Sequence, residues 1–149
     1  MMKRLCSIVC VIALLIFTSS CALIEGEKMI CSYKTNNYEV KYRGSNIIQV
    51  RISRQYIFEG DFEAKVEQKK EEIQAYEKKI LRNPGITSEI VLDRAMVEHI
   101  ITVELDGYDY VNDPFHLFDV TLTEDDVKDV EALRQRLVDQ NFYCDPIVP

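Results

Sequence analysis

The sequence lacks the segments that usually separate domains. No internal repeat, low-complexity tract or Pro/Gly/Ser-rich linker interrupts residues 29–145, and the chain has only 5 glycines and 4 prolines. A chain of 149 residues suits one compact domain. The sequence therefore predicts a single domain over residues 29–149.

Positive charge is also scarce. The chain carries 18 Lys and Arg residues against 25 Asp and Glu residues. Lys3 and Arg4 belong to an N-terminal segment considered below, and without it 16 basic residues remain against 25 acidic ones, a net charge of −9. Proteins bind nucleic acid largely by neutralising phosphates with Lys and Arg, so the balance speaks against a nucleic-acid partner.

Residue types that carry catalysis are few. The chain has only 2 histidines, and no serine lies in the strand-turn-helix motif that presents a nucleophile. His99 falls on the apolar face of an expected strand, which favours a core or edge histidine over a ligand. We predict no catalytic, cofactor-binding or metal-binding residues, and hence a non-enzymatic binding or interaction domain.

The alternative is a secreted metal-dependent or hydrolytic enzyme. Asp106, Asp109, Asn112 and Asp113 form an acidic loop whose oxygen atoms are the ligand type that Ca²⁺ prefers, although the loop lacks the order of an EF-hand. An enzyme would need the Asp106–Asp113 carboxylates and His116 to converge on a pocket. Otherwise they are solvated turn residues. The aromatic residues near this loop are expected either to form a contact surface or to be buried over the sheet. They are Tyr108, Tyr110, Phe115 and Phe118.

The apolar run at the N-terminus is too short to cross a bilayer of ~30 Å as a helix. Lys3 and Arg4 precede the run from Leu5 to Phe17, which only Ser7 interrupts, and small or polar residues follow at 18–20. This order is typical of a secretory signal. We therefore predict a signal peptide over residues 1–20, with an uncleaved N-terminal anchor as the alternative.

Cys21 follows the signal directly. Ser19-Ser20-Cys21 resembles the end of a bacterial lipobox, whereas Thr18 stands where that pattern usually has Leu. We predict that Cys21 carries the lipid, palmitate included, that holds the protein on the extracytoplasmic side of the cell membrane. Residues 21–28 would form the tether. An ordinary signal peptidase cutting after Ser20 or Ala22 is the alternative.

The remaining cysteines favour the same arrangement. Cys6 and Cys10 leave with the signal, so lipidation of Cys21 leaves Cys31 and Cys144 as an even pair. Exported proteins meet oxidising surroundings, which permits a disulfide between the two. The closed loop of about 113 residues would contribute about 4–5 kcal/mol in the chain-entropy model. Two separate buried thiols are the alternative.

Hydrophobic periodicity predicts the order of three strands, a helix, two strands and a helix. Asp61 is the expected N-cap of the first helix, and Thr123 with Asp126 forms the expected capping box of the last. The expected strands lie around residues 29–34, 38–43, 48–58, 86–92 and 95–105, with a short return strand possible at 141–145. The predicted fold class is α+β: an antiparallel sheet of about five strands with two helices packed on one face.

These patterns resemble the YehR-like family of small bacterial lipoproteins, whose domain has no assigned function. The resemblance covers residues 1 to about 144. It is carried by the cysteine after the signal, the YEVKYRGSN strand region, a Lys/Glu-rich helix at 63–81, the ITSEIVLDRAMVEHIITVEL hairpin and Leu137 to Phe142. It implies an α+β surface lipoprotein and carries over no catalytic residues. The expected partners are the membrane, through the lipid anchor, and a protein or small molecule.

Overall fold

The computed structural model describes residues 26–146, which form an α+β domain around one antiparallel sheet. The predicted fold class is confirmed, with six strands in place of about five and three α-helices in place of two. In chain order the elements are β1 (Glu27–Tyr33), β2 (Asn36–Arg43), β3 (Asn46–Ile57), α2 (Phe62–Ile80), β4 (Ile86–Asp93), β5 (Met96–Glu104), the 3-10 turn η1 (Leu105–Gly107), α3 (Glu124–Lys128), α4 (Val130–Asp139) and β6 (Tyr143–Cys144).

The strands lie side by side in the order β4-β5-β3-β2-β1-β6. The β1-β2-β3 meander and the β4-β5 hairpin form as predicted, and β5 joins them by pairing with β3. The sixth strand is the short return strand, which pairs Cys144 with Cys31 of β1. β1 begins at Glu27, so the expected tether over 21–28 ends before residue 27.

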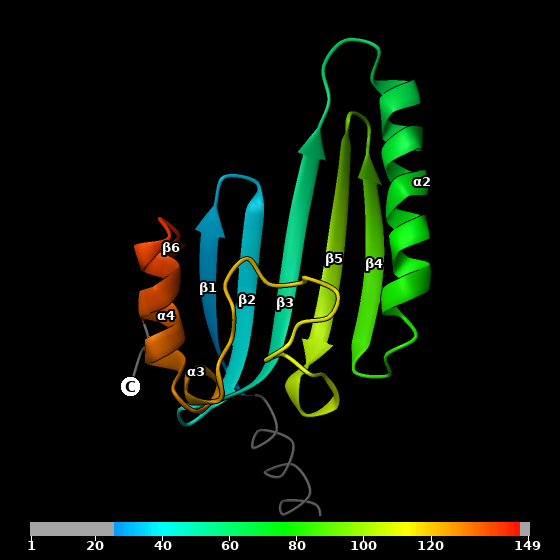
Figure 1. Ribbon diagram of the computed structural model, residues 1–149. Helices are drawn as coiled ribbons and strands as arrows, with labels where there is room; N and C mark the ends of the chain where they lie inside the picture. The colour runs from blue at the N-terminus through cyan, green and yellow to red at the C-terminus, as the bar shows by residue number, and fades with distance from the viewer. Residues whose placement is uncertain (1–25, 147–149) are drawn as a thin grey trace, which may run out of the picture.

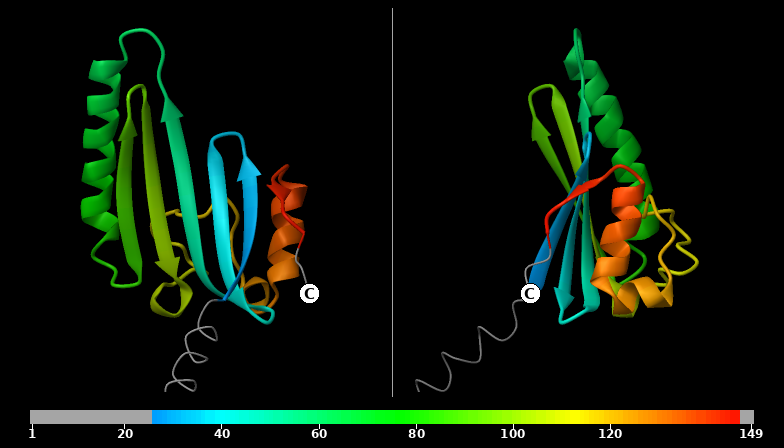
Figure 2. Two further views of the ribbon diagram at one scale, coloured as in Figure 1. Left: turned by 180° about the vertical axis from the view of Figure 1, so that it is seen from behind. Right: turned by 90° about the vertical axis from the view of Figure 1, so that its left-hand side faces the viewer.

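All the helices cover one face of the sheet. Figure 1 and the edge-on view of Figure 2 show α2, α3, α4 and the loop between η1 and α3 on the same side, and no other element of residues 26–146 lies across the other side. The side chains of Tyr38, Val40 and Tyr42 on β2 point to the covered side and are 2%, 0% and 2% exposed. Strand alternation sends their polar neighbours to the opposite side, which we call the open face.

The last helix is not continuous, contrary to prediction. Thr123 and Asp126 form the expected capping box of α3, but Asp129 is extended, with φ −139° and ψ 95°. The Asp129 carboxylate then accepts hydrogen bonds from the backbone N–H groups of Glu131 and Ala132, which makes it the N-cap of α4. The apolar stripe of α4 is buried: Val130, Leu133 and Leu137 are 4%, 1% and 0% exposed.

α2 is held to the sheet by a sparse apolar stripe. Asp61 is in the predicted N-cap position, but its side chain makes no capping hydrogen bond. Ile73 and Ile80 are buried, and the Tyr76 hydroxyl donates to the Phe115 carbonyl at 2.9 Å. None of the helices within residues 26–146 is long and apolar enough to cross a membrane.

Candidate functional site

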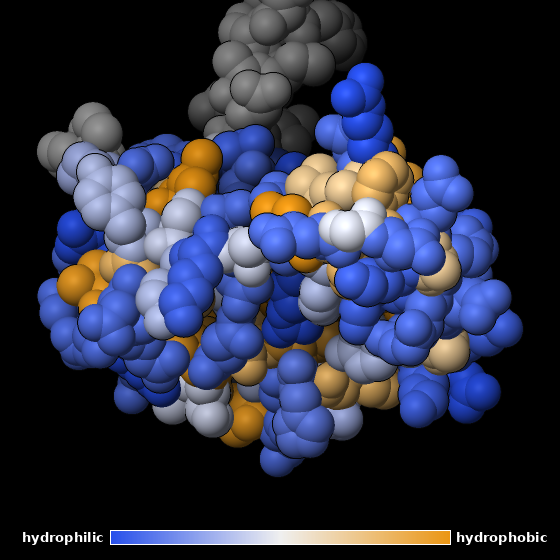
Figure 3. Space-filling view, turned by 90° about the horizontal axis from the view of Figure 1, so that it is seen from above, coloured by the Kyte–Doolittle hydropathy of each residue, from blue (hydrophilic) through white to orange (hydrophobic). Residues whose placement is uncertain are grey.

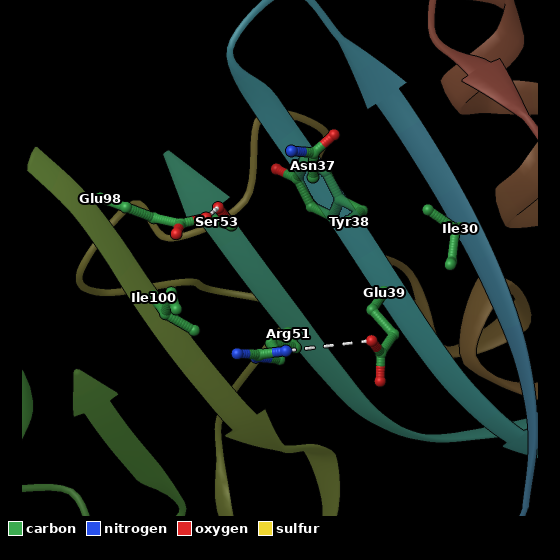
Figure 4. A pocket seen from close by; sticks show the side chains of 8 residues that line it. All are labelled: Ile30, Asn37, Tyr38, Glu39, Arg51, Ser53, Glu98 and Ile100. Carbon is green, nitrogen blue, oxygen red and sulfur yellow. Dashed lines mark hydrogen bonds and ion pairs between the residues drawn. The ribbon is translucent and has the colours of Figure 1, made fainter. Parts of the chain in front are cut away.

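The open face carries a shallow hollow over the middle strands. It has a volume of about 230 Å³ and is lined by Ile30, Asn37, Glu39, Arg51, Ser53, Glu98 and Ile100, together with Tyr38, whose side chain points to the covered side. Figure 4 shows these side chains on neighbouring strands, with the loop running behind the sheet. A second hollow of about 200 Å³ shares Arg51 and Ile100 with the first and continues toward Thr87 and Thr102. We refer to the two hollows together as the trough.

Ile100 forms the apolar floor of the trough. On β5 it pairs with Ser53 of β3 on one side and with Glu89 of β4 on the other. It is only 7% exposed, although no helix or loop between Gly26 and Pro146 covers this face. Its flanking strands therefore enclose an apolar side chain that lies apart from the main core beneath the helices.

Charged groups of both signs surround this floor. One oxygen of the Glu39 carboxylate lies 2.9 Å from Nζ of Lys28, and its other oxygen lies 4.0 Å from Nη1 of Arg51. On the β5 side, one oxygen of Glu98 accepts from the Ser53 hydroxyl and from the Gln55 amide. The trough thus presents the Arg51 guanidinium toward one end and the Glu98 carboxylate toward the other.

A third hollow, of about 170 Å³, lies between α2 and the covered face and reaches His99. His99 is 3% exposed, in the core as its strand pattern predicted, and its Nε2 lies 2.8 Å from the Ser88 hydroxyl. Burial, aided by the charge of Arg54 and opposed by Glu77, lowers the pKa of His99. No carboxylate within residues 26–146 hydrogen-bonds to the other ring nitrogen, so a serine-histidine-acid arrangement is not assembled here.

The acidic loop is built around one buried carboxylate. Asp113 is 9% exposed and accepts from the Tyr108 hydroxyl and from the backbone N–H groups of Leu117 and Phe118. Burial, with the hydrogen bond to Asp113, raises the pKa of Tyr108. His116 is exposed, with φ +52°. The loop carboxylates and His116 therefore do not meet in a pocket, and Asp113 orders the loop.

The aromatic residues of this loop are packed over the sheet and do not form an exposed contact surface. Tyr108 is buried, and Tyr110, Phe115 and Phe118 are partly buried against the core. No group of three or more His, Cys, Asp or Glu side chains that could hold a metal ion occurs between Gly26 and Pro146.

Other surfaces offer less to a ligand. A hollow of about 320 Å³ at the end of the sheet near residue 26 is lined by Ile47, Ile48, Glu104, Leu105, Asp106, Tyr110 and Val127. At the opposite end, Ile57 and Leu92 are 65% and 49% exposed. Figure 3 shows that this opposite end is mostly hydrophilic, with apolar side chains in small separate patches. Scattered exposed apolar residues are normal on a protein surface.

The sequence-predicted cross-link falls at the edge of the sheet. The Cys31 and Cys144 sulfur atoms are 2.01 Å apart and the Cα atoms 4.0 Å apart. The oxidation state of this pair in the exported protein stays a prediction. Cys21 and the signal peptide over 1–20 lie outside residues 26–146, so lipidation also stays a prediction.

Sequence reasoning missed the trough. The polar residues Gln49, Arg51, Ser53 and Gln55 alternate along β3 with its inward positions, and this alternation shows that they face outward. The available signal was Ile100, an apolar residue between Glu98 and Thr102 on the outward side of β5. The alternation of polar and apolar residues does not show which outward-facing residues of different strands lie side by side.

Comparison with known proteins supports the fold alone. No family model and no curated protein matches the chain. The domain is similar to the NMR structure of a protein from Streptococcus pneumoniae TIGR4, with a TM-score of 0.57 and 14% sequence identity. The match covers 79% of this chain and 83% of that chain.

Proposed function

We propose that this protein is an exported lipoprotein, anchored in the cell membrane through Cys21, which acts as a non-enzymatic binding domain through the open face of its sheet. The observation that carries this proposal is the asymmetry of the sheet. Among the residues that the structure describes, three helices and a loop cover one face, whereas none covers the other, which holds the trough. A face with a partly unused guanidinium, a carboxylate and an enclosed apolar floor has the mixed chemistry of a ligand site.

The position of the anchor fits this role. Gly26 lies five positions after Cys21, and an extended chain of that length spans at most about 18 Å. The domain would therefore stay close to the membrane surface, on its extracytoplasmic side. The predicted partners are the membrane, through the lipid, and a protein or small molecule at the open face, with nucleic acid disfavoured by the net charge of −7 for the whole chain.

The alternative of a metal-dependent or hydrolytic enzyme has lost its structural support. It required the acidic loop and His116 to converge, and instead Asp113 is engaged by the loop's own donors while His116 is exposed. We therefore favour binding over catalysis.

Two experiments test the proposal. Metabolic labelling with an alkyne fatty acid should tag the wild-type protein and not Cys21→Ser, and the variant should move from the membrane fraction to the soluble fraction. Equal labelling of both proteins would refute the lipid anchor.

The ligand surface is tested by a photo-crosslinking residue at Thr102, in the trough, and at Lys78, on the exposed side of α2. After irradiation of intact cells, mass analysis of the purified protein should show a discrete adduct from position 102 and none from position 78. Identical adduct patterns at the two positions, or none at 102, would remove the open face as the binding surface.

A further inference from the structure

We propose that the trough binds a short extended peptide that has a free C-terminal carboxylate and a basic side chain toward its other end. This inference rests on the proposed function, because it names the ligand class of the same open face. It follows from the order of three features along the sheet: a guanidinium, an apolar floor and a carboxylate.

Arg51 is the end of the trough that accepts the ligand carboxylate. Its side chain is 43% exposed, and its one ion pair within residues 26–146 is with Glu39, at 4.0 Å from Nη1, while Glu89 lines the same hollow farther along. That distance is too long for a hydrogen bond, so the donors of the guanidinium stay available. A guanidinium presents a planar pair of N–H groups that matches a carboxylate. Glu39, which forms an ion pair with Lys28, attracts the guanidinium without a hydrogen bond to it.

Glu98 is the end that accepts the cation. The Ser53 hydroxyl and the Gln55 amide both donate hydrogen bonds to Oε1 of Glu98. Its Oε2 atom therefore retains acceptor capacity, since an ionised carboxylate accepts about four hydrogen bonds. Ser53 and Gln55 also restrict the rotation of Glu98, so that little side-chain freedom is lost when a ligand binds.

The spacing suits a peptide of a few residues. Glu98 pairs with Gln55, which lies four positions along β3 from Arg51. At ~3.3 Å per strand residue this separates the two backbone levels by roughly 13 Å, and the long side chains shorten the gap that a ligand must bridge. Ile100 lies between the two ends, where an aliphatic ligand side chain would contact it, with Ile30 at the rim.

Other ligand classes fit these features less well. A fatty acid would leave Glu98 without a cation and would place its chain beside the charged side chains of Glu39, Arg51 and Glu98. A polyanion would meet the carboxylates of Glu39 and Glu98 as well as Arg51. A molecule with charges of both signs and a small apolar part satisfies all three features at once.

Titration of the 15N-labelled protein, purified as the cell makes it, with the tripeptide Lys-Ala-Ala tests the inference by NMR. We expect saturable, roughly millimolar binding, because both charge pairs are exposed, with the largest amide shifts at Arg51, Ser53 and Ile100. Arg51→Ala should weaken binding about tenfold, the effect of losing one charged hydrogen-bonding partner. Amidating the peptide's C-terminus should weaken binding to the wild type similarly, and should change nothing further in Arg51→Ala.

Matched variants keep the test specific. Arg82→Ala removes an exposed arginine away from the trough and should bind like the wild type. Glu98→Gln should abolish the preference for Lys-Ala-Ala over acetyl-norleucyl-Ala-Ala, which lacks both cations. Unchanged amide shifts elsewhere in each variant would show that the fold is intact.

Three results would overturn the inference: no saturable shifts at tens of millimolar peptide, shifts confined to other surfaces, or equal losses in Arg51→Ala and Arg82→Ala. A crosslinked adduct from position 102 together with no peptide binding would overturn only the ligand class. Failure of both the crosslink and the peptide titration would overturn the open face as a binding surface.

Discussion

Two arginines on β3 show how differently the two faces of the sheet are used. Arg54, on the covered face, donates to the Leu117 carbonyl at 2.6 Å and lies 3.6 Å from the Asp119 carboxylate, with its side chain 20% exposed. Arg51, three positions earlier, points to the open face and has only the distant Glu39. Arg54 binds the loop to the covered face of the sheet. Arg51 keeps most of its hydrogen-bonding capacity on the open face.

The same contrast holds for other polar groups. The Tyr38 hydroxyl, on the covered face, donates to the Asp119 carboxylate at 2.8 Å and accepts from the Asp119 backbone N–H at 2.7 Å. Burial raises the pKa of Tyr38, so it remains a neutral donor at physiological pH. Polar residues beneath the helices are therefore committed to holding the cover, and function is better sought on the face without one.

The largest expected effect concerns the link between the edge strand and the sheet. Replacing both Cys31 and Cys144 by Ser should lower the free energy of unfolding by about 4–5 kcal/mol, because the unfolded chain loses a closure of 113 residues. Urea unfolding of the variant and the wild type measures this loss. Non-reducing peptide mapping should find the two cysteine peptides joined, and two free thiols in protein from the cell surface would contradict the cross-link.

The next effect tests the cover itself. Leu137 on α4 is fully buried, so Leu137→Ala should cost about 2–5 kcal/mol through lost burial and the cavity that remains. The neighbouring Val138 is 37% exposed on the same helix, and Val138→Ala should cost under about 0.5 kcal/mol. Urea midpoints of the two variants decide the matter. Similar midpoints would mean that α4 does not pack on the sheet as described.

Substitutions of Arg54 and Arg51 compare how much each face of the sheet contributes to stability. Arg54→Ala should cost about 1–3 kcal/mol, since the Leu117 carbonyl would lose its charged donor in a partly buried position. Arg51→Ala should cost under about 0.5 kcal/mol, as expected for an exposed residue with one weak ion pair. Thermal or urea unfolding of both variants provides the measurement. If Arg51→Ala proved as costly as Arg54→Ala, the open face would be structural rather than available.

Local patterns were enough to predict the buried faces of β2 and β5. The alternation of Tyr38, Val40 and Tyr42 gave the covered face of β2, and the Thr123–Asp126 spacing gave the start of α3. These features depend on neighbours a few residues away, where propensity and capping act. A helix break at Asp129 was also open to sequence reasoning, because Asp is a favoured N-cap residue.

The trough was beyond such reasoning because strand order and register create it. Ile100 is enclosed only because Ser53 and Glu89 flank it, and these residues come from strands on either side of β5. Arg51 looks on the sequence like any exposed charge on a strand. Side-chain contacts of α2 show the same limit, because Lys69 lies 4.8 Å from the centre of the Tyr56 ring and pairs with Glu72.

The smallest expected effect is a pH dependence that arises from the covered face. Burial lowers the pKa of His99 below its ordinary value of 6.5, so at pH values between the folded and unfolded pKa the unfolded chain binds more protons than the folded one. The stability that neutral His99 contributes is therefore fully present above pH 6.5 and is lost as the pH falls toward the folded pKa. Each unit of lowering corresponds to about 1.4 kcal/mol.

The comparison variant for this effect is His99→Gln, which keeps a polar side chain near Ser88 and does not titrate. The free energy of unfolding of the wild type should fall more between pH 7.5 and pH 5.5 than that of His99→Gln. The carboxylates and the exposed His116 are present in both proteins, so their contributions cancel in the difference. Parallel profiles would mean that His99 accepts a proton without disturbing the contact between α2 and the sheet. The covered face would then tolerate a new charge beside Arg54, and its contrast with the open face would be weaker than the contacts suggest.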